Sequence, residues 1–193
     1  VAYPDKMVAL DKLNPGQIPA VYLQYAATDA EVSTVVGGTP ATEAQNENIG
    51  RTNMSEIHRF QYDEGTKKYK VSLKWPNGPK WEGVSGVDTK WHNWVDNEKK
   101  QVTRDNVLII VANWEMGISE GVTATHKEPI VKLDGKDGHF FYLNQGKVVE
   151  GTWSKASTDA PFRFKLDDGT FLKMAPGQTW IELAKAQKYV TVS

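Results

Sequence analysis

The chain has 193 residues, of which 24% are charged and 39% are hydrophobic, and its formal net charge is −1. This ordinary globular composition excludes a disordered chain, and the balanced charge argues against nucleic acid as the main partner, since phosphate binding needs a concentrated basic surface. The sequence has no cysteine, which excludes disulfides, thiolate zinc sites and cysteine nucleophiles.

The first 56 residues are expected to form short helices, an extended stretch and a loop. The helical i, i+3, i+4 pattern is carried by Tyr3, Met7, Leu10 and Leu13. A capping pair, Thr28 with Glu31, predicts a second short helix that ends at the glycines 37–38. Residues 37–51 are polar and rich in Gly, Thr, Asn and Glu, so we expect them to form a loop.

From Ile57 onward the sequence predicts strands joined by tight turns. The continuous apolar run 107–111 predicts a central strand that is buried on both faces. Two later hairpins turn at residues 144–146 and 167–169, where glycines supply the positive φ that tight turns need. Shorter strands over 179–183 and 189–192 complete the chain.

These elements predict a mainly β fold of the α+β type, with one or two short N-terminal helices. The strands suit an antiparallel sheet, a sandwich or an open barrel, and no long helices separate them, so parallel β-α-β units are not expected. The expected core is built from residues 57–75, 107–114, 139–154 and 161–183. We expect a single domain over residues 1–193, in which an N-terminal segment, 1–56, precedes a β-core, 57–193.

Four ordered segments carry a resemblance to a known family. They are Phe60–Asp63 with Tyr69, Asp105–Ile109, Gly146–Trp153 and Pro176–Ile181. Together, from about Asn48 to Leu183, they resemble the C-terminal part of the YerB-like bacterial lipoproteins, a domain of unknown function. The resemblance implies a cell-envelope location with a membrane tether, and it implies no known reaction. The lipid-bearing cysteine and the N-terminal half of such lipoproteins are missing, which leaves a fragment or a free-standing relative open.

The densest unusual feature is a group of four tryptophans between residues 75 and 94. The candidate ligand-binding residues are Trp75, Trp81, Trp91, His92 and Trp94. Flat indoles stack on sugar rings or on peptide prolines, so such a group can form a binding face. The alternative interpretation is that these side chains close the core beneath a long loop. We expect Trp91 and Trp94 near the apex of this loop and His92 within it.

No catalytic residue, metal site or cofactor is predicted. The four histidines form neither His-x-x-x-His nor His-Glu-x-x-His, and no nucleophile motif of the Gly-x-Ser-x-Gly or Ser-x-x-Lys kind is convincing. An acid pair such as Asp96 and Glu98 would serve a glycosidase only if the fold brought the right two carboxylates together, at roughly 5 to 9 Å.

The sequence therefore predicts a non-enzymatic, extracytoplasmic binding or assembly module of the cell envelope. Its expected partner is an envelope protein, a glycan surface or a second copy of the chain, and an edge strand such as Tyr189–Val192 offers unpaired backbone groups for this purpose. Membrane contact is expected only through a lipid anchor lost upstream. The alternatives are a carbohydrate-binding or cell-wall-binding module that uses the Trp-rich loop, and a hydrolase with dispersed carboxylates.

Overall fold

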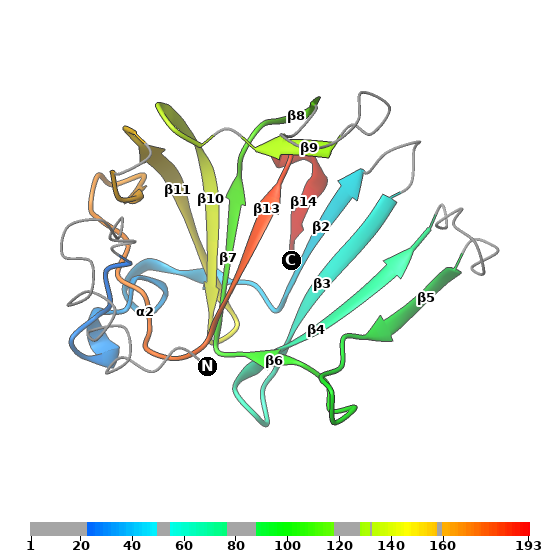
Figure 1. The fold of residues 1–193 in the computed structure, drawn as a ribbon. Coiled ribbons are helices and arrows are strands. Elements are labelled where there is room, and N and C mark those ends of the chain that lie inside the picture. Colours follow the sequence, from blue (N-terminus) through cyan, green and yellow to red (C-terminus); the bar gives the residue numbers. More distant parts are fainter. Residues whose placement is uncertain (1–22, 50–54, 77–87, 118–127, 132, 158–159) are drawn as a thin grey trace, which may run out of the picture.

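The structure is a computed structural model that describes residues 23–49, 55–76, 88–117, 128–131, 133–157 and 160–193. In these residues, strands form two six-stranded sheets and a separate two-stranded ribbon (Figure 1). Two short helical turns, η1 (Asp29–Glu31) and α2 (Ser33–Gly37), precede the sheets in the chain. The mainly β fold class predicted from the sequence is confirmed, and the sheets are open rather than closed into a barrel.

Sheet 1 has the strand order β1–β11–β10–β7–β13, and β12 also pairs with β11. The bounds are β1 Thr39–Pro40, β7 Asn106–Val111, β10 Lys136–Asn144, β11 Lys147–Lys155, β12 Arg163–Leu166 and β13 Thr179–Ala184. The turn predicted between β10 and β11 is present, because Gln145 and Gly146 both have a positive φ.

One pair of strands in sheet 1 departs from the expected antiparallel arrangement. Strand β13 runs parallel to β7, with Trp180 opposite Val107. The chain reaches β13 from β7 through strands β8 to β12, so the long crossover that a parallel pair requires is made of strands instead of a helix. The sheet is therefore mixed, although no β-α-β unit is needed to build it.

Sheet 2 has the order β14–β2–β3–β4–β5, and β6 also pairs with β4. The bounds are β2 Glu43–Ile49, β3 Ser55–Asp63, β4 Lys68–Trp75, β5 Asp88–Asn93, β6 Thr103–Arg104 and β14 Val190–Val192; the ribbon consists of β8 (Trp114–Gly117) and β9 (Glu128–Val131). Strand β14 follows the turn η3 (Gln187–Tyr189) and lies at the edge of the sheet, as predicted for the end of the chain.

The loop predicted over residues 37–51 is wrong, because β1 and β2 lie there. Strand β2 is polar in sequence, yet its inward side chains Ala44 and Asn46 are fully buried. The amide of Asn46 donates a hydrogen bond to Glu182 on β13, and this partner makes the burial of a polar side chain tolerable. The local sequence carries no sign of so distant a partner.

Strand β7 lies at the centre of two hydrophobic clusters, as its apolar sequence predicts. On one face, Leu108 and Ile110 pack in a cluster with Trp153. On the other face, Val107 and Ile109 pack in a cluster with Phe60 of sheet 2, so the two sheets share this core. The four strand residues are between 0 and 3% exposed, which confirms the prediction of a strand buried on both faces.

The N-terminal turns are anchored to one end of sheet 1. The second predicted helix is present only as two short turns, η1 and α2, and the predicted cap is wrong, because the side chain of Thr28 makes no capping hydrogen bond. The helix predicted at residues 3–13 lies outside the described residues. Thr34 of α2 is fully buried, and its hydroxyl donates to Asn144 of β10 at 3.3 Å. This contact holds α2 over the neighbouring strand β11.

Candidate functional site

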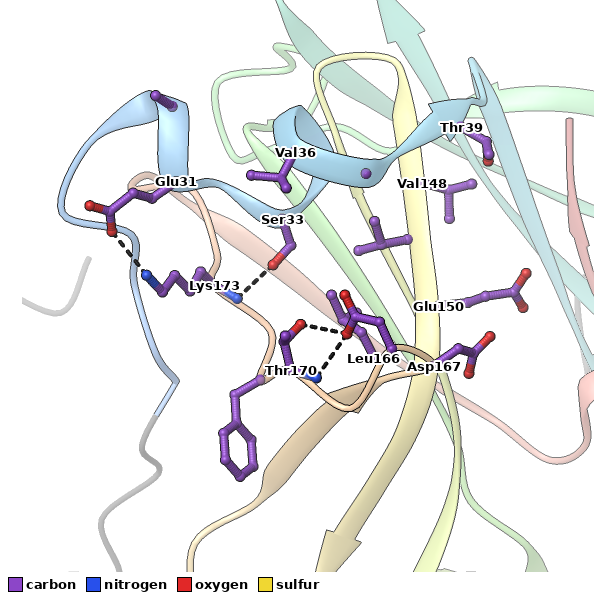
Figure 2. Close-up of a pocket in the computed structure, with 15 residues that line it drawn as sticks. Glu31, Ser33, Val36, Thr39, Val148, Glu150, Leu166, Asp167, Thr170 and Lys173 are labelled. Carbon is purple, nitrogen blue, oxygen red and sulfur yellow. Dashed lines mark hydrogen bonds and ion pairs between the residues drawn. The ribbon is translucent and has the colours of Figure 1, made fainter.

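The outer edge of β11 is paired only in part. Strand β1 pairs with residues 147–148 of β11, and β12 pairs with residues 151–154. No strand of the described residues pairs with Val149 and Glu150 on this side, so the ladder is interrupted between two paired stretches. A pocket of about 550 Å³ opens at this interruption (Figure 2). We call it the edge pocket; residues from three segments, 30–39, 148–150 and 166–173, line it.

Carboxylates outnumber cations in the edge pocket. The acids are Glu31, Glu150, Asp167 and Asp168, and the single basic side chain, Lys173, is already paired with Glu31 at 3.0 Å. Asp168 accepts hydrogen bonds from the backbone N–H and the hydroxyl of Thr170, and these bonds lower the pKa of Asp168. In the described part of the chain, no lysine or arginine pairs with Asp167 or Asp168.

Two of these acids face each other across the end of a ladder. Gly151 of β11 is opposite Leu166 of β12, so extending this register by one residue places Glu150 opposite Asp167. Both carboxylates lie at the same end of the pocket in Figure 2. Like charges directly opposite in a sheet destabilise it. The imidazole of His139 lies 2.8 Å from Glu150, and the aliphatic part of Lys165 reaches the turn at Gly169. No lysine or arginine of the described residues forms an ion pair with Glu150 or Asp167, so this end of the pocket favours a further cation.

Exposed apolar side chains also line the edge pocket. Val36 is 74% exposed and Phe171 is 43% exposed, although both are large apolar residues. Gly37 adds open space, since a side-chain carbon built there would meet no atom within 4 Å. A pocket of this size that combines apolar walls with a few polar groups is typical of ligand sites.

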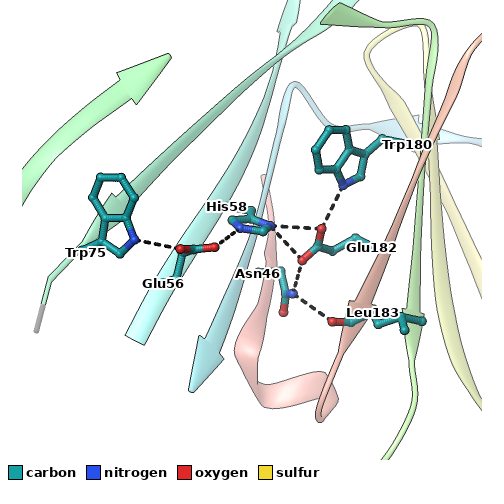
Figure 3. Close-up of polar contacts among 7 residues, drawn as sticks. All are labelled: Asn46, Glu56, His58, Trp75, Trp180, Glu182 and Leu183. Atoms are coloured by element: carbon teal, nitrogen blue, oxygen red, sulfur yellow. Dashed lines mark hydrogen bonds and ion pairs between the residues drawn. The ribbon is translucent and has the colours of Figure 1, made fainter. Parts of the chain in front are cut away.

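A second group of charged residues surrounds His58 of β3, where His58 and Glu182 are buried and Glu56 is partly exposed (Figure 3). Its Nδ1 lies 3.0 Å from Oε1 of Glu182 on β13, and its Nε2 lies 2.5 Å from Oε1 of Glu56. The indole N–H of Trp180 donates to Glu182 at 2.9 Å, and the indole N–H of Trp75 donates to Glu56 at 2.7 Å. We call this group the inter-sheet cluster.

The protonation states of the inter-sheet cluster follow from its contacts. Burial disfavours the charged imidazole, but hydrogen bonds with Glu182 and Glu56 outweigh this effect and raise the pKa of His58 to about 9. Burial opposes the charge of Glu182 too, yet the hydrogen bond with His58 leads the contacts that lower its pKa overall. The cluster is therefore an imidazolium between two carboxylates, and its partners all come from the chain itself.

The structure divides the predicted aromatic residues between the two faces of sheet 2. Trp91 and His92 lie on strand β5, so the loop predicted for them is wrong. His92 is opposite Leu73, and its ring lies 5.7 Å from that of Trp75 on the inner face, where Trp94 lies 5.5 Å from His58. Trp91 points to the outer face, because neighbouring strand residues alternate.

The fifth candidate, Trp81, lies outside the described residues. Of the five candidates, three therefore lie on one face and one on the other, and they do not share a single surface. Ligand binding by these residues stays a prediction.

Neither charged group could be recognised from local sequence patterns. The turn predicted at residues 167–169 is present, with Gly169 at φ +87°, and its two adjacent acids were the only local sign of the edge pocket. His58 and Glu182 are 124 residues apart, so no spacing rule reveals their contact.

Within the part of the chain that the structure describes, no group of three or more His, Asp or Glu side chains is arranged to hold a metal ion. Calcium takes six to eight oxygen ligands, so the pair formed by Glu150 and Asp167 suits an organic cation better. The described helices include none that is long and apolar enough to span a bilayer.

Comparison with known proteins agrees with the resemblance in the sequence. Residues 50–181 match the family described as "Protein of unknown function (DUF3048) C-terminal domain". The crystal structure of the YerB protein from Bacillus subtilis is similar, with a TM-score of 0.53 at 20% identity over 78% of this chain and 43% of that chain. At this identity the likeness shows the fold alone, and the chain spans less than half the length of that protein. No curated protein matches the chain.

Proposed function

The chain belongs to the DUF3048 C-terminal domain family, whose function is unknown, and we propose that it is a non-enzymatic binding module for a segment of a partner protein. The proposed site is the edge pocket. The observation that carries the proposal is the interrupted pairing of β11 inside a pocket of about 550 Å³. The lipoprotein resemblance supports the cell envelope as the place where the module acts.

The exposed backbone of β11 supports recognition of an extended peptide. The backbone oxygen of Gly146 accepts a hydrogen bond from Ala41 on the outer side of β11. Peptide groups of alternate residues point to the same edge, so the N–H of Glu150 also faces outward, into the interruption, while its C=O faces the N–H of Asp167 at the end of the β12 ladder. An added peptide can pair there as a short strand. Because β1 and β12 bound the gap, this contact is short, and the ligand's side chains must supply the specificity.

The charge and shape of the edge pocket support a lysine or arginine in the bound segment. The cationic end would lie between Glu150 and Asp167, and the aliphatic stem would cover the exposed Phe171. Exposed ion pairs contribute about 1 kcal/mol or less. We therefore propose a transient complex of modest affinity rather than a permanent one.

A displayed library of random heptapeptides tests the proposal directly. The library is selected on the whole 193-residue chain and, in parallel, on Gly37→Trp, whose indole would occupy the open space at Gly37. We expect peptides with a central lysine or arginine to be enriched on the wild type and lost on Gly37→Trp. Gly37→Ala is the matched control, because its methyl group leaves the pocket open.

Two results would count against this function. If the enriched peptides bind Gly37→Trp as well as the wild type, they use another surface. If no peptide is enriched, the interrupted edge is not a peptide site. A lysine-bearing segment of a second copy would be recognised by a mass in solution that rises with concentration and returns to that of the monomer in Gly37→Trp.

A further inference from the structure

The outer face of sheet 2 carries a second charged feature that is independent of the edge pocket. Arg59 of β3 lies over the indole of Trp91 on β5, with the guanidinium carbon 4.2 Å from the ring centroid. The ammonium nitrogen of Lys74 on β4 lies 4.4 Å from the centroid of the same ring. Three neighbouring strands thus bring two cations to one indole.

The guanidinium of Arg59 makes one side-chain hydrogen bond, through Nε, and its two terminal nitrogens make none among the described residues. Its Nε donates to Oγ of Ser72 at 3.3 Å, and its guanidinium carbon lies over the ring of Trp91. Among the described residues, no carboxylate pairs with Arg59 or with Lys74. The two terminal nitrogens of Arg59 can therefore bind an oxyanion in the bidentate manner that a planar guanidinium favours.

The position of Lys74 strengthens the case for an anion. Arg59 and Lys74 lie against the same ring, so two positive charges are concentrated on one small area of the outer face. An anion bound beside them would be attracted by both charges. Glu47 of β2 is opposite Ile57 and forms no ion pair with Arg59, so it limits the site to the surface of β3, β4 and β5.

The surroundings of these residues favour a sugar over a membrane or a protein. In the described residues, the large apolar side chains that are exposed lie outside strands β2–β5. The described part of this face therefore lacks exposed apolar groups for insertion into a membrane and lacks the apolar centre of a typical protein interface. Its neighbouring side chains, such as Gln61 and Asn93, are amides that suit sugar hydroxyl groups.

We propose that Arg59, Lys74 and Trp91 form a binding site for a carboxylate-bearing sugar of an acidic polysaccharide. Arg59 holds the carboxylate through its terminal nitrogens, Lys74 adds a second charge, and the indole keeps both cations in place. The site uses one of the four clustered tryptophans, so it differs from the aromatic loop that the sequence predicts. It does not depend on the edge pocket.

Isothermal titration of the whole chain with tri-galacturonic acid tests this site, with neutral galactotriose as the comparison ligand. We expect tri-galacturonic acid to bind, and its affinity to fall as salt rises. Arg59→Gln should weaken binding by about 10-fold or more, and Arg59→Lys should weaken it less, since the charge remains while the fork is lost. Lys70→Gln is the matched control, because Lys70 lies on the same face and is paired with Asp63.

Several outcomes would overturn the proposal. These are no binding of tri-galacturonic acid, equal binding of galactotriose, or an unchanged affinity in Arg59→Gln. Binding to vesicles that contain phosphatidylglycerol, without binding to the trisaccharide, would also overturn it in favour of a lipid surface. Circular dichroism checks the fold of Arg59→Gln; if that variant is unfolded, Lys74→Gln replaces it and must lose affinity for the proposal to stand.

Discussion

Two pairs of carboxylates in this molecule differ in how far the chain itself neutralises their charges. In the inter-sheet cluster, Glu56 and Glu182 share a buried imidazolium and receive indole hydrogen bonds. In the edge pocket, Glu150 and Asp167 face each other across the end of a ladder; His139 pairs with Glu150, and no lysine or arginine of the described residues pairs with either acid. The first pair is satisfied by the chain itself, so it belongs to the architecture. The second pair has no lysine or arginine partner among the described residues, so it is the better candidate for a binding site.

The largest expected effect comes from breaking the inter-sheet cluster. His58→Leu removes the cation that Glu182 needs, and Glu182 is 5% exposed. Removing one partner of a buried pair leaves an uncompensated charge, so we expect a loss of about 3 kcal/mol in the free energy of unfolding. Urea denaturation measures this change. His92→Gln, at an exposed histidine of the same sheet, should change the free energy by no more than about 0.5 kcal/mol.

The second prediction compares two glycines at the edge pocket. A side-chain carbon on Gly151 would lie 2.1 Å from the backbone oxygen of Lys165, where β12 pairs with β11. Gly151→Ala should therefore destabilise the protein by about 1–3 kcal/mol, since the strands cannot move apart without losing their pairing. Gly37→Ala meets no atom and should be close to neutral. Equal stability of the two variants in urea would show that β12 is not closely paired with β11 at Gly151.

The third prediction concerns the pH dependence of the inter-sheet cluster. The pKa of His58 is raised from 6.5 to about 9, so its contribution to stability is complete below pH 6.5 and is lost as the pH rises through 9. The pKa of Glu182 is lowered from 4.5, so its contribution is lost as the pH falls below that value. The difference in Tm between wild type and His58→Leu should be largest between these limits and narrow toward pH 10. A constant difference would mean that the imidazole is neutral.

The smallest effect on stability is expected at the edge pocket. The double substitution Glu150→Gln with Asp167→Asn removes two facing negative charges that no lysine or arginine of the described residues neutralises. We expect the Tm to stay the same or to rise slightly, while binding of lysine-bearing peptides is lost. A clear fall in Tm by calorimetry would instead show that these two acids stabilise the fold. It would contradict the assignment of Glu150 and Asp167 to a binding site.

Local features of the fold were predictable because they depend on short-range chemistry. The apolar run at residues 107–111 predicted a strand buried on both faces, and Asp167-Asp168-Gly169 predicted a turn. Strand β2 was not predicted because a polar residue such as Asn46 is typical of loops. Its burial depends on a hydrogen bond to the distant Glu182, which the local sequence does not reveal. The parallel pair β7–β13 was missed because its connection consists of other strands.

The candidate sites were less predictable because each joins distant segments. Glu150 lies on β11, whereas Asp167 lies in the turn after β12. No pattern in the sequence predicts which residues of β11 pair with β1 and which pair with β12. The density of tryptophans suggested one binding face. Because Trp91 and His92 are neighbours on a strand, their side chains point to opposite faces of the sheet, which could not be expected for residues predicted in a loop.

The central claim is best tested by a ¹H–¹⁵N spectrum of the whole chain titrated with a lysine-bearing heptapeptide from the library selection. A second titration uses the same peptide with norleucine in place of lysine. We predict that the amide of Glu150 shifts most, together with Gly37 and the turn at 167–169, and that norleucine weakens binding by about 10-fold. Binding that leaves the Glu150 amide unmoved, or that is unaffected by norleucine, would contradict it.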